Sequence, residues 1–252
     1  MAWNPELYNQ FKEERYQPFH DLVGHIYPRQ GMNIIDLGCG TGELTQLLAE
    51  KFSPHKITGI DTSAEMLAKA PRTGRIAFVN RSVEAQLERE EHWDLIFANA
   101  SLQWVDDHAV LFPKIISKLH SGGQLAVQMP SQQENRLNQV LDTLVRESPF
   151  REALQGWRRD SPVLGLDAYT QLFFQQGAQD VVIYQKVYPL LVPAADRLYD
   201  FIAGSALVPY MERLENQLQD LLEAAFRERI RKQFNGTPVV YPFKRLILYG
   251  RF

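Results

Sequence analysis

The sequence predicts an α/β fold with a doubly wound, mostly parallel seven-stranded sheet, an N-terminal helical segment and a C-terminal helical insert. From Met32 onward, short apolar runs alternate with stretches of helical periodicity. Such alternation is typical of parallel β-α-β units with right-handed crossovers. A glycine-rich turn at 38–42 joins the first run to the first helical stretch, where doubly wound folds bind ligands.

The expected elements follow in chain order. Asn4-Pro5 indicates the start of a first helix, and Pro18 indicates the start of a second. The first five strands are expected at Met32–Leu37, Lys56–Ile60, Ile76–Val79, Trp93–Ala98 and Gln124–Met129. The helices between them are expected at Glu43–Lys51, Ala64–Ala70 and Ala109–Leu119.

The pattern loosens after Pro130. Helices are expected there at Arg136–Glu147, Ala168–Gln176, Asp196–Ala203 and Glu212–Gln233, and strands at Val181–Val187 and Leu246–Tyr249. We predict a single domain over 1–252. Residues 1–30 form a helical lid, 31–130 the ligand-binding core, and 131–252 the substrate-side helices and the last two strands.

Composition excludes several classes of protein. The chain has 252 residues, a formal net charge of -3 and one cysteine, so it holds no internal disulfide. A protein that grips a phosphate backbone usually carries a basic stripe, so we expect no nucleic-acid partner. We see neither a secretory signal nor an apolar run of the roughly 20 residues that span a bilayer. We therefore expect a cytoplasmic protein without a membrane partner, and we expect it to be a monomer.

The strongest motif is Asp36-Leu37-Gly38-Cys39-Gly40-Thr41-Gly42. Glycine lets a chain turn sharply and approach a ligand without a Cβ in the way. A dinucleotide fingerprint requires G-x-G-x-x-G or -A. Here the third glycine comes one residue early and Glu43 stands in the place of the small residue, so the spacing disfavours a dinucleotide.

A second acid, Asp61, ends the second expected strand. A carboxylate at this position can accept hydrogen bonds from both hydroxyls of a ribose. The alternative is a helix N-cap, a role for which Ser63 competes.

Together these residues resemble the class I S-adenosylmethionine-dependent methyltransferases, which have a Rossmann-like fold. The resemblance implies that Gly38, Gly40 and Gly42 wrap the methionine moiety of S-adenosylmethionine, that Asp36 orients this loop or reaches the amino group, and that Asp61 holds the ribose. The product would be S-adenosylhomocysteine.

The resemblance assigns further cofactor contacts. Met66 matches the residue that packs on the adenine, with core packing as the alternative. Ser82 stands where the family usually has an acid that reads the adenine amino group, so the charge is missing. The remaining implied contacts are Cys39, Thr62, Val83 and Asn99.

The strip "DLIFANASLQW" at 94–104 contains no proline pair of the kind used by methyltransferases of base amino groups. Together with "LFP" at 111–113, "LAVQMP" at 125–130 and "WNPELYNQF" at 3–11, it resembles the trans-aconitate 2-methyltransferase branch. The resemblance implies methyl esterification of a small polycarboxylic acid. Val208 departs from the pattern, because an arginine is expected there.

A carboxylate is already ionised at pH 7, so esterification requires no general base. Substrate carboxylates need cationic partners. Arg15 and Arg245 match positions of the resembled family and are expected in this role. The alternative for each arginine is a surface salt bridge. The other expected pocket residues are Tyr8, Gln103, Trp104 and His108, of which Trp104 could equally be core. We interpret Asp106 and Asp107 as N-cap candidates and predict no metal.

Two other functions remain open. One is a carboxyl methyltransferase acting on an acid bound to an acyl carrier, as in biotin synthesis, with Arg227–Lys232 as a docking segment or simply a solvated helix. The other is a non-catalytic S-adenosylmethionine-binding module.

Overall fold

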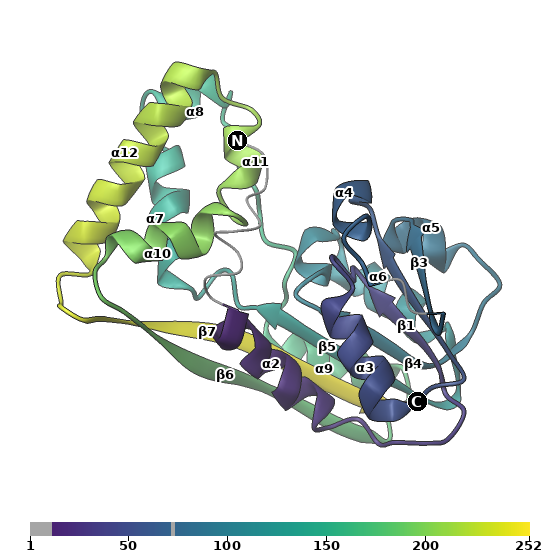
Figure 1. Ribbon diagram of the computed structural model, residues 1–252. Coiled ribbons are helices and arrows are strands. Elements are labelled where there is room, and N and C mark those ends of the chain that lie inside the picture. Colours follow the sequence, from purple (N-terminus) through teal and green to yellow (C-terminus); the bar gives the residue numbers. More distant parts are fainter. Residues whose placement is uncertain (1–11, 72–73) are drawn as a thin grey trace. The chain divides into compact units, whose positions relative to one another are not determined.

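The computed structural model describes residues 12–71 and 74–252, with side chains from Tyr16 onward apart from 72–73. Its seven-stranded sheet has the order β3-β2-β1-β4-β5-β7-β6 (Figure 1). The strands are β1 Asn33–Leu37, β2 Lys56–Asp61, β3 Ile76–Asn80, β4 Trp93–Asn99, β5 Leu119–Pro130, β6 Asp180–Val192 and β7 Val239–Arg251. The pairs from β3 to β5 are parallel, and β7 runs antiparallel to β5. The predicted doubly wound, mostly parallel sheet is confirmed.

The chain divides into two compact units. The core unit comprises the described residues of 17–130, 162–186 and 245–252, and the helical unit comprises 131–161, 187–244 and the described residues 12–16. Strands β6 and β7 each begin in one unit and end in the other.

Helices cover both faces of the sheet in the core unit. Helices α2 (Lys12–Val23) and α3 (Glu43–Phe52) bury Phe19, Leu22 and Leu48 with Ile34 and Phe97 of the sheet. The other face packs against α5 (Val83–Leu87), α6 (His108–Ile116) and α9 (Leu166–Gln175). A short α4 (Ala64–Leu67) follows β2, and the 3-10 helix η1 (Leu102–Trp104) follows β4.

The helical unit has its own apolar core. It contains α7 (Arg136–Val145), α8 (Phe150–Ala153), α10 (Asp196–Ala203), α11 (Val208–Met211) and α12 (Asn216–Gln233). Side chains of these helices pack with Leu190 and Val192 of β6 and Tyr241 of β7. Among the described residues, no helix is long and apolar enough to span a membrane.

Three expectations need correction. Pro18 lies inside the continuous helix α2 and does not start a new one; Phe19 and Leu22, which follow it in the same helix, are held in the core. The expected helix at 212–233 begins only at Asn216. Strands β6 and β7 extend well beyond the apolar runs that predicted them. The helix expected at Asn4-Pro5 lies outside the described residues.

Candidate functional site: the carboxyl edge of the sheet

Two of the three loop glycines are required by neighbouring protein atoms. Gly38, with φ 79°, would place a Cβ 2.3 Å from the Cβ of Ser101. Gly42, with φ 72°, would place one 2.4 Å from the ring of Phe78. Both positions are therefore closed to any larger residue by packing alone.

Gly40 is different. Its φ is 56°, and a Cβ there would meet only the sulfur of Met66, at 3.6 Å. Space therefore remains beside the backbone of Gly40, and Met66 stands at its border. This is the close-approach geometry that a glycine loop offers to a ligand.

Asp61 connects this loop to the next one. Its Oδ2 accepts a hydrogen bond from the Gly40 amide at 2.9 Å, and its Oδ1 accepts one from the Ser63 amide at 2.8 Å. A carboxylate has about four lone-pair sites, so capacity remains for hydroxyl donors. Ser63 caps α4 by accepting from the Met66 amide, so the N-cap alternative for Asp61 is wrong.

Asp36 lies buried beneath the loop, at 2% exposure. Burial raises its pKa to about 7; the hydrogen bond from Thr45 Oγ1, at 2.6 Å, opposes this, and the nearby charge of Asp61 adds to it. Burial likewise raises the pKa of Cys39, whose side chain packs against Gly59. The loop therefore rests on a carboxyl group that titrates near neutral pH.

Three of the expected cofactor contacts lie on the turns that follow β2 and β3. Ser82 is the N-cap of α5 and accepts from the Ala85 amide at 3.2 Å, so its oxygen serves the helix. Val83 begins that helix and is buried. The carbonyl of Thr62 accepts from Asn80 Nδ2 at 2.9 Å.

Three polar side chains form a row on adjacent strands. Asn99 ends β4, Gln128 lies opposite it on β5, and Arg245 lies on β7. Arg245 Nη1 donates to Gln128 Oε1 at 2.7 Å, and Gln128 Nε2 donates to Asn99 Oδ1 at 2.7 Å. Gln128 and Arg245 are buried, at 0% and 4% exposure. We did not predict Gln128, although a glutamine within the apolar run "LAVQMP" was a signal for it.

The residues after β4 have different environments. Gln103 is buried and its Nε2 donates to the carbonyl of Ala100 at 2.7 Å. Trp104 is 38% exposed, so it is not plain core.

His108 is buried, with Nε2 bonded to the carbonyl of Leu102 at 2.9 Å and Nδ1 bonded to the hydroxyl of Tyr169. Burial lowers its pKa. Both ring nitrogens are engaged by the protein, so we assign His108 a structural role in place of the expected substrate contact.

Tyr8 and the side chain of Arg15 lie outside the described residues. Asp107 occupies the N-cap position of α6 without a side-chain capping bond. Within the described part of the chain, no cluster of His, Cys, Asp and Glu has a metal-binding arrangement.

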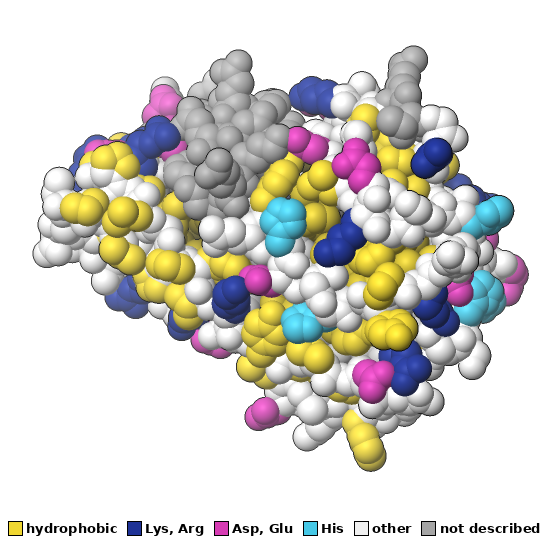
Figure 2. Space-filling view, turned by 60° about the horizontal axis from the view of Figure 1, so that its bottom comes forward, with side chains coloured by type: hydrophobic (Ala, Val, Ile, Leu, Met, Phe, Trp, Pro, Cys, Tyr) yellow, Lys and Arg dark blue, Asp and Glu magenta, His cyan; other side chains and the backbone are white. Residues whose placement is uncertain are grey.

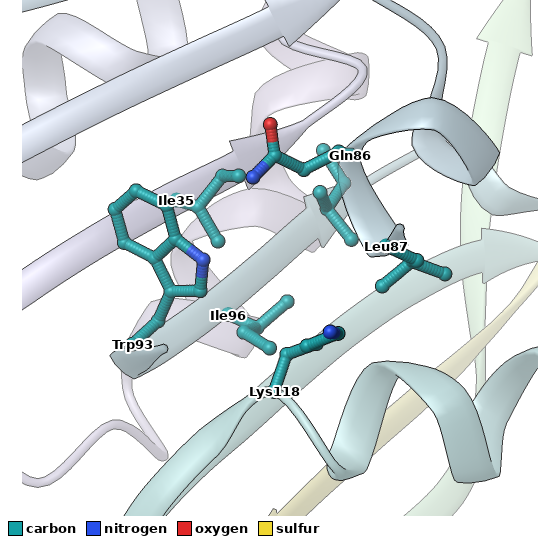
Figure 3. Close-up of a pocket in the computed structure, with 7 residues that line it drawn as sticks. Ile35, Gln86, Leu87, Trp93, Ile96 and Lys118 are labelled. Carbon is teal, nitrogen blue, oxygen red and sulfur yellow. The ribbon is translucent and has the colours of Figure 1, made fainter. Parts of the chain in front are cut away.

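A small hollow lies in the core unit. It is lined by Ile35, Ile96, Leu87 and the first residue of β4, Trp93, on the face covered by α5 (Figure 3). Gln86, Lys118 and Leu37 complete its lining. On the face drawn in Figure 2, basic and acidic side chains of the described residues are interspersed.

Comparisons with known proteins place this geometry in a family. The family described as "Methyltransferase domain" matches residues 8–183. A trans-aconitate 2-methyltransferase from Deinococcus radiodurans is 36% identical over 98% of this chain and 97% of its own. One from Variovorax paradoxus is 32% identical over 100% of this chain and 96% of its own.

Solved structures share the fold. The YcgJ protein from a Bacillus species has a TM-score of 0.62 at 13% identity and covers 94% of this chain and 98% of its own. Haemonchus contortus phosphoethanolamine N-methyltransferase 2, in complex with S-adenosyl-L-methionine, has a TM-score of 0.54 at 18% identity. The match covers 93% of this chain and 52% of that one. The chain belongs to the S-adenosylmethionine-dependent methyltransferases, in the group that contains the trans-aconitate 2-methyltransferases.

Proposed function

We propose that this enzyme transfers a methyl group to one carboxylate of trans-aconitate or of a closely similar small polycarboxylic acid. The observation that carries the proposal is identity of 36% along almost the whole chain with a trans-aconitate 2-methyltransferase. Because that likeness includes the segments after β5, it extends beyond the part of the fold that all relatives need for the cofactor.

When bound, S-adenosylmethionine would supply an electrophilic methyl group on its sulfonium, with S-adenosylhomocysteine, which keeps the electron pair of the S–C bond, as the leaving group. The nucleophile is already ionised at pH 7, so the protein needs no base. His108, with both nitrogens engaged, fits a site without a histidine base. The protein's task is to align the reactants and exclude water, which can contribute roughly 7–11 kcal/mol.

The residues at the loop fit the cofactor. The open side of Gly40 leaves room for the methionine moiety, Asp61 retains acceptor capacity for ribose hydroxyls, and Met66 borders the same space. Asp36 offers a negative charge to a cationic ligand. The full proposed set is Asp36, Gly38, Cys39, Gly40, Gly42, Asp61, Thr62, Met66, Ser82, Val83 and Asn99.

For the acid we propose Arg15 and Arg245 as the cationic partners, with Tyr8, Gln103 and Trp104 as pocket walls. Residues 1–30 would act as a lid, 31–130 as the cofactor-binding core and 131–252 as the substrate side. The alternative of an acid bound to an acyl carrier loses support, because the basic residues of its expected docking segment are each already paired with an acidic side chain. They are Arg227, Arg229, Arg231 and Lys232.

The test is turnover with methyl-labelled cofactor against a panel of acids. We expect label in the ester of trans-aconitate and little in monocarboxylic acids. Label only in an acid bound to an acyl carrier would replace this function with the carrier alternative. Tight S-adenosylhomocysteine binding with no turnover on any acid would favour a binding module.

A further inference from the structure

The hydrogen bonds between Arg245, Gln128 and Asn99 have only one possible direction. A guanidinium carries donors and no acceptor, and it keeps its proton at any pH that a protein tolerates. Gln128 must therefore turn Oε1 toward Arg245 and Nε2 toward Asn99. Since Nε2 can only donate, Asn99 must present Oδ1 to it.

This leaves the Nδ2 group of Asn99 turned away from Gln128. Asn99 is the last residue of β4 and is half-buried, and its Nδ2 has no acceptor among the described residues. The backbone around it is held as well, because the Ala100 amide donates to the Gln128 carbonyl at 2.8 Å and Ser101 Oγ donates to the Leu37 carbonyl. The N–H donors of Asn99 thus have a defined direction at the carboxyl edge of the sheet.

We propose that Gln128 is a positioning residue, which holds Asn99 so that its amide donates a hydrogen bond to a carboxylate bound at the carboxyl edge of β4. This inference rests on the proposed function. Two sources offer that chemistry: the acid substrate and the methionine carboxylate of the cofactor. The buried positive charge of Arg245, relayed through an oriented amide, favours an anionic acceptor over a cationic group.

The diagnostic variant is Gln128→Glu. Glutamate keeps the shape and an acceptor for Arg245, but it offers no N–H to Asn99. Asn99 then turns its Nδ2 toward the new carboxylate and presents Oδ1 to the ligand. We expect affinity for the carboxylate ligand to fall about tenfold or more, the loss of one hydrogen bond to a charged acceptor. Gln128→Met releases both Asn99 and Arg245 but places no acceptor opposite Asn99, so we expect a smaller loss of ligand affinity.

The order of these effects separates positioning from structural support. If Gln128 only supported the fold, the near-isosteric Glu, paired with Arg245, would be tolerated better than Met. Asn99→Asp should reproduce the Gln128→Glu phenotype, because it too replaces the donor with an acceptor. The matched control is Gln124→Glu on the same face of β5, where Gln124 bonds the backbone of Tyr27 and the hydroxyl of Tyr249. It should leave ligand affinity unchanged.

Two measurements identify the source of the carboxylate. The calorimetric Kd of S-adenosylhomocysteine reports on the methionine carboxylate. The reference ligand is 5′-methylthioadenosine, which lacks that carboxylate. KM for trans-aconitate at saturating cofactor reads the acid. A loss in either, with thermal unfolding showing a folded protein, supports the proposal. Unchanged values in both overturn it, and so does tighter S-adenosylhomocysteine binding, which would mean that a cation faces Asn99.

A failure of the proposed function can be distinguished from a failure of this inference. The proposed function is tested by wild-type turnover on the acid, whereas the calorimetric measurement needs no turnover. If the wild type methylates no acid, the effect of Gln128→Glu on S-adenosylhomocysteine affinity alone decides for or against the positioning role.

Discussion

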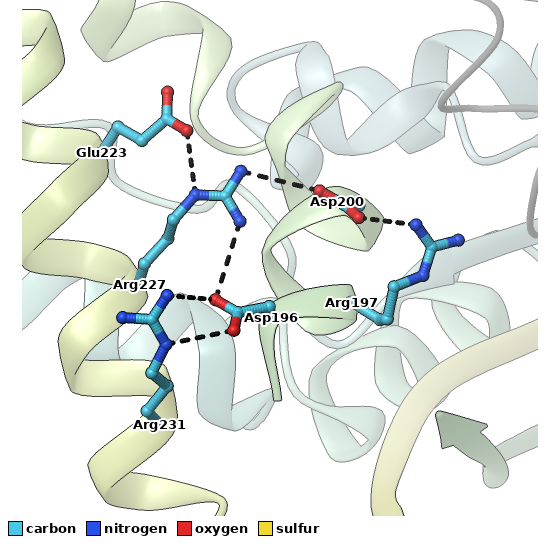
Figure 4. A network of polar contacts seen from close by, with 6 residues as sticks. All are labelled: Asp196, Arg197, Asp200, Glu223, Arg227 and Arg231. Atoms are coloured by element: carbon cyan, nitrogen blue, oxygen red, sulfur yellow. Dashed lines mark hydrogen bonds and ion pairs between the residues drawn. The ribbon is translucent and has the colours of Figure 1, made fainter. Parts of the chain in front are cut away.

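The core unit and the helical unit use charge in opposite ways. In the core unit Asp36 is 2% exposed with Thr45 as its hydrogen-bond partner, and Arg245 is 4% exposed beside Gln128. In the helical unit, α10 and α12 carry a network of Asp196, Arg197, Asp200, Glu223, Arg227 and Arg231 (Figure 4). There Arg231 and Asp196 are 56% and 46% exposed.

The two arrangements differ in what a lost partner costs. Asp196 contacts both Arg227 and Arg231, and Arg227 also contacts Glu223 and lies 3.6 Å over the ring of Tyr199. Water and a second partner compensate for any one loss, so such exposed pairs contribute little. A buried group has no such substitute. Large functional effects should therefore concentrate at the carboxyl edge of the core unit.

The largest expected effect is that of Gly40→Val. The new side chain would occupy the space beside Met66 that we assign to the cofactor, so S-adenosylhomocysteine affinity should fall roughly 100-fold or more while the protein stays folded. Calorimetry and thermal unfolding measure the two properties. Gly38→Ala is a comparison for packing: its Cβ meets Ser101, so it should lower the free energy of unfolding by about 1–3 kcal/mol. Unchanged affinity in folded Gly40→Val would refute the loop assignment.

Asp61→Ala should come next. It removes the acceptor proposed for the ribose and the one that holds the Gly40 amide, so S-adenosylhomocysteine binding should weaken by about 1.5–3 kcal/mol. The readout is calorimetric Kd. NAD should give no thermal shift with the wild type. A shift with NAD and none with S-adenosylhomocysteine would contradict the cofactor assignment at this loop.

Asp36 should make cofactor affinity depend on pH. Its folded pKa of about 7 exceeds the unfolded value near 4, so the folded protein binds the extra proton between these values. Stability without cofactor should therefore decline as pH rises from about 4 to 7 and level off above. A cationic cofactor favours the carboxylate, so S-adenosylmethionine affinity should rise up to about tenfold from pH 6 to 8.

Asp36→Asn should abolish both trends, measured by denaturant unfolding and by calorimetry across pH.

With both ligands saturating, kcat should stay flat from about pH 6 to 8.5, because no base titrates. A pKa near 7 that persists in chemistry-limited kcat would show instead that a protein group must lose a proton, and would favour a hydroxyl or amine substrate.

The smallest effect should come from Asp196→Asn in the helical unit. Arg231 remains exposed to solvent, and Arg227 remains paired with Glu223. The Tm should therefore shift by only a degree or two, and KM for either ligand should not change. A large kinetic effect would erase the contrast between the units.

Local patterns predicted the core unit well. The apolar runs at 32–37, 56–60 and 93–98 match β1, β2 and β4 within a residue or two, because a parallel strand buried on both faces reads as a continuous apolar run. Residues 180–192 and 239–251 were harder. Val187, Leu191 and Val240 are exposed there, so apolar residues mark neither face, and the strands outrun the pattern.

The sequence by itself determined the glycine loop and the acid after β2, because a left-handed backbone conformation and a strand-ending carboxylate are local properties written in residue type and spacing. Only the tertiary structure decided that Gly38 and Gly42 are required by Ser101 and Phe78, whereas Gly40 leaves space. It alone assembled Asn99, Gln128 and Arg245, which lie 29 and 117 residues apart along the chain. The direction of a hydrogen bond depends on which donors and acceptors strand pairing brings within reach. Which side chains come within reach is decided by the pairing of strands in the sheet and not by any single segment.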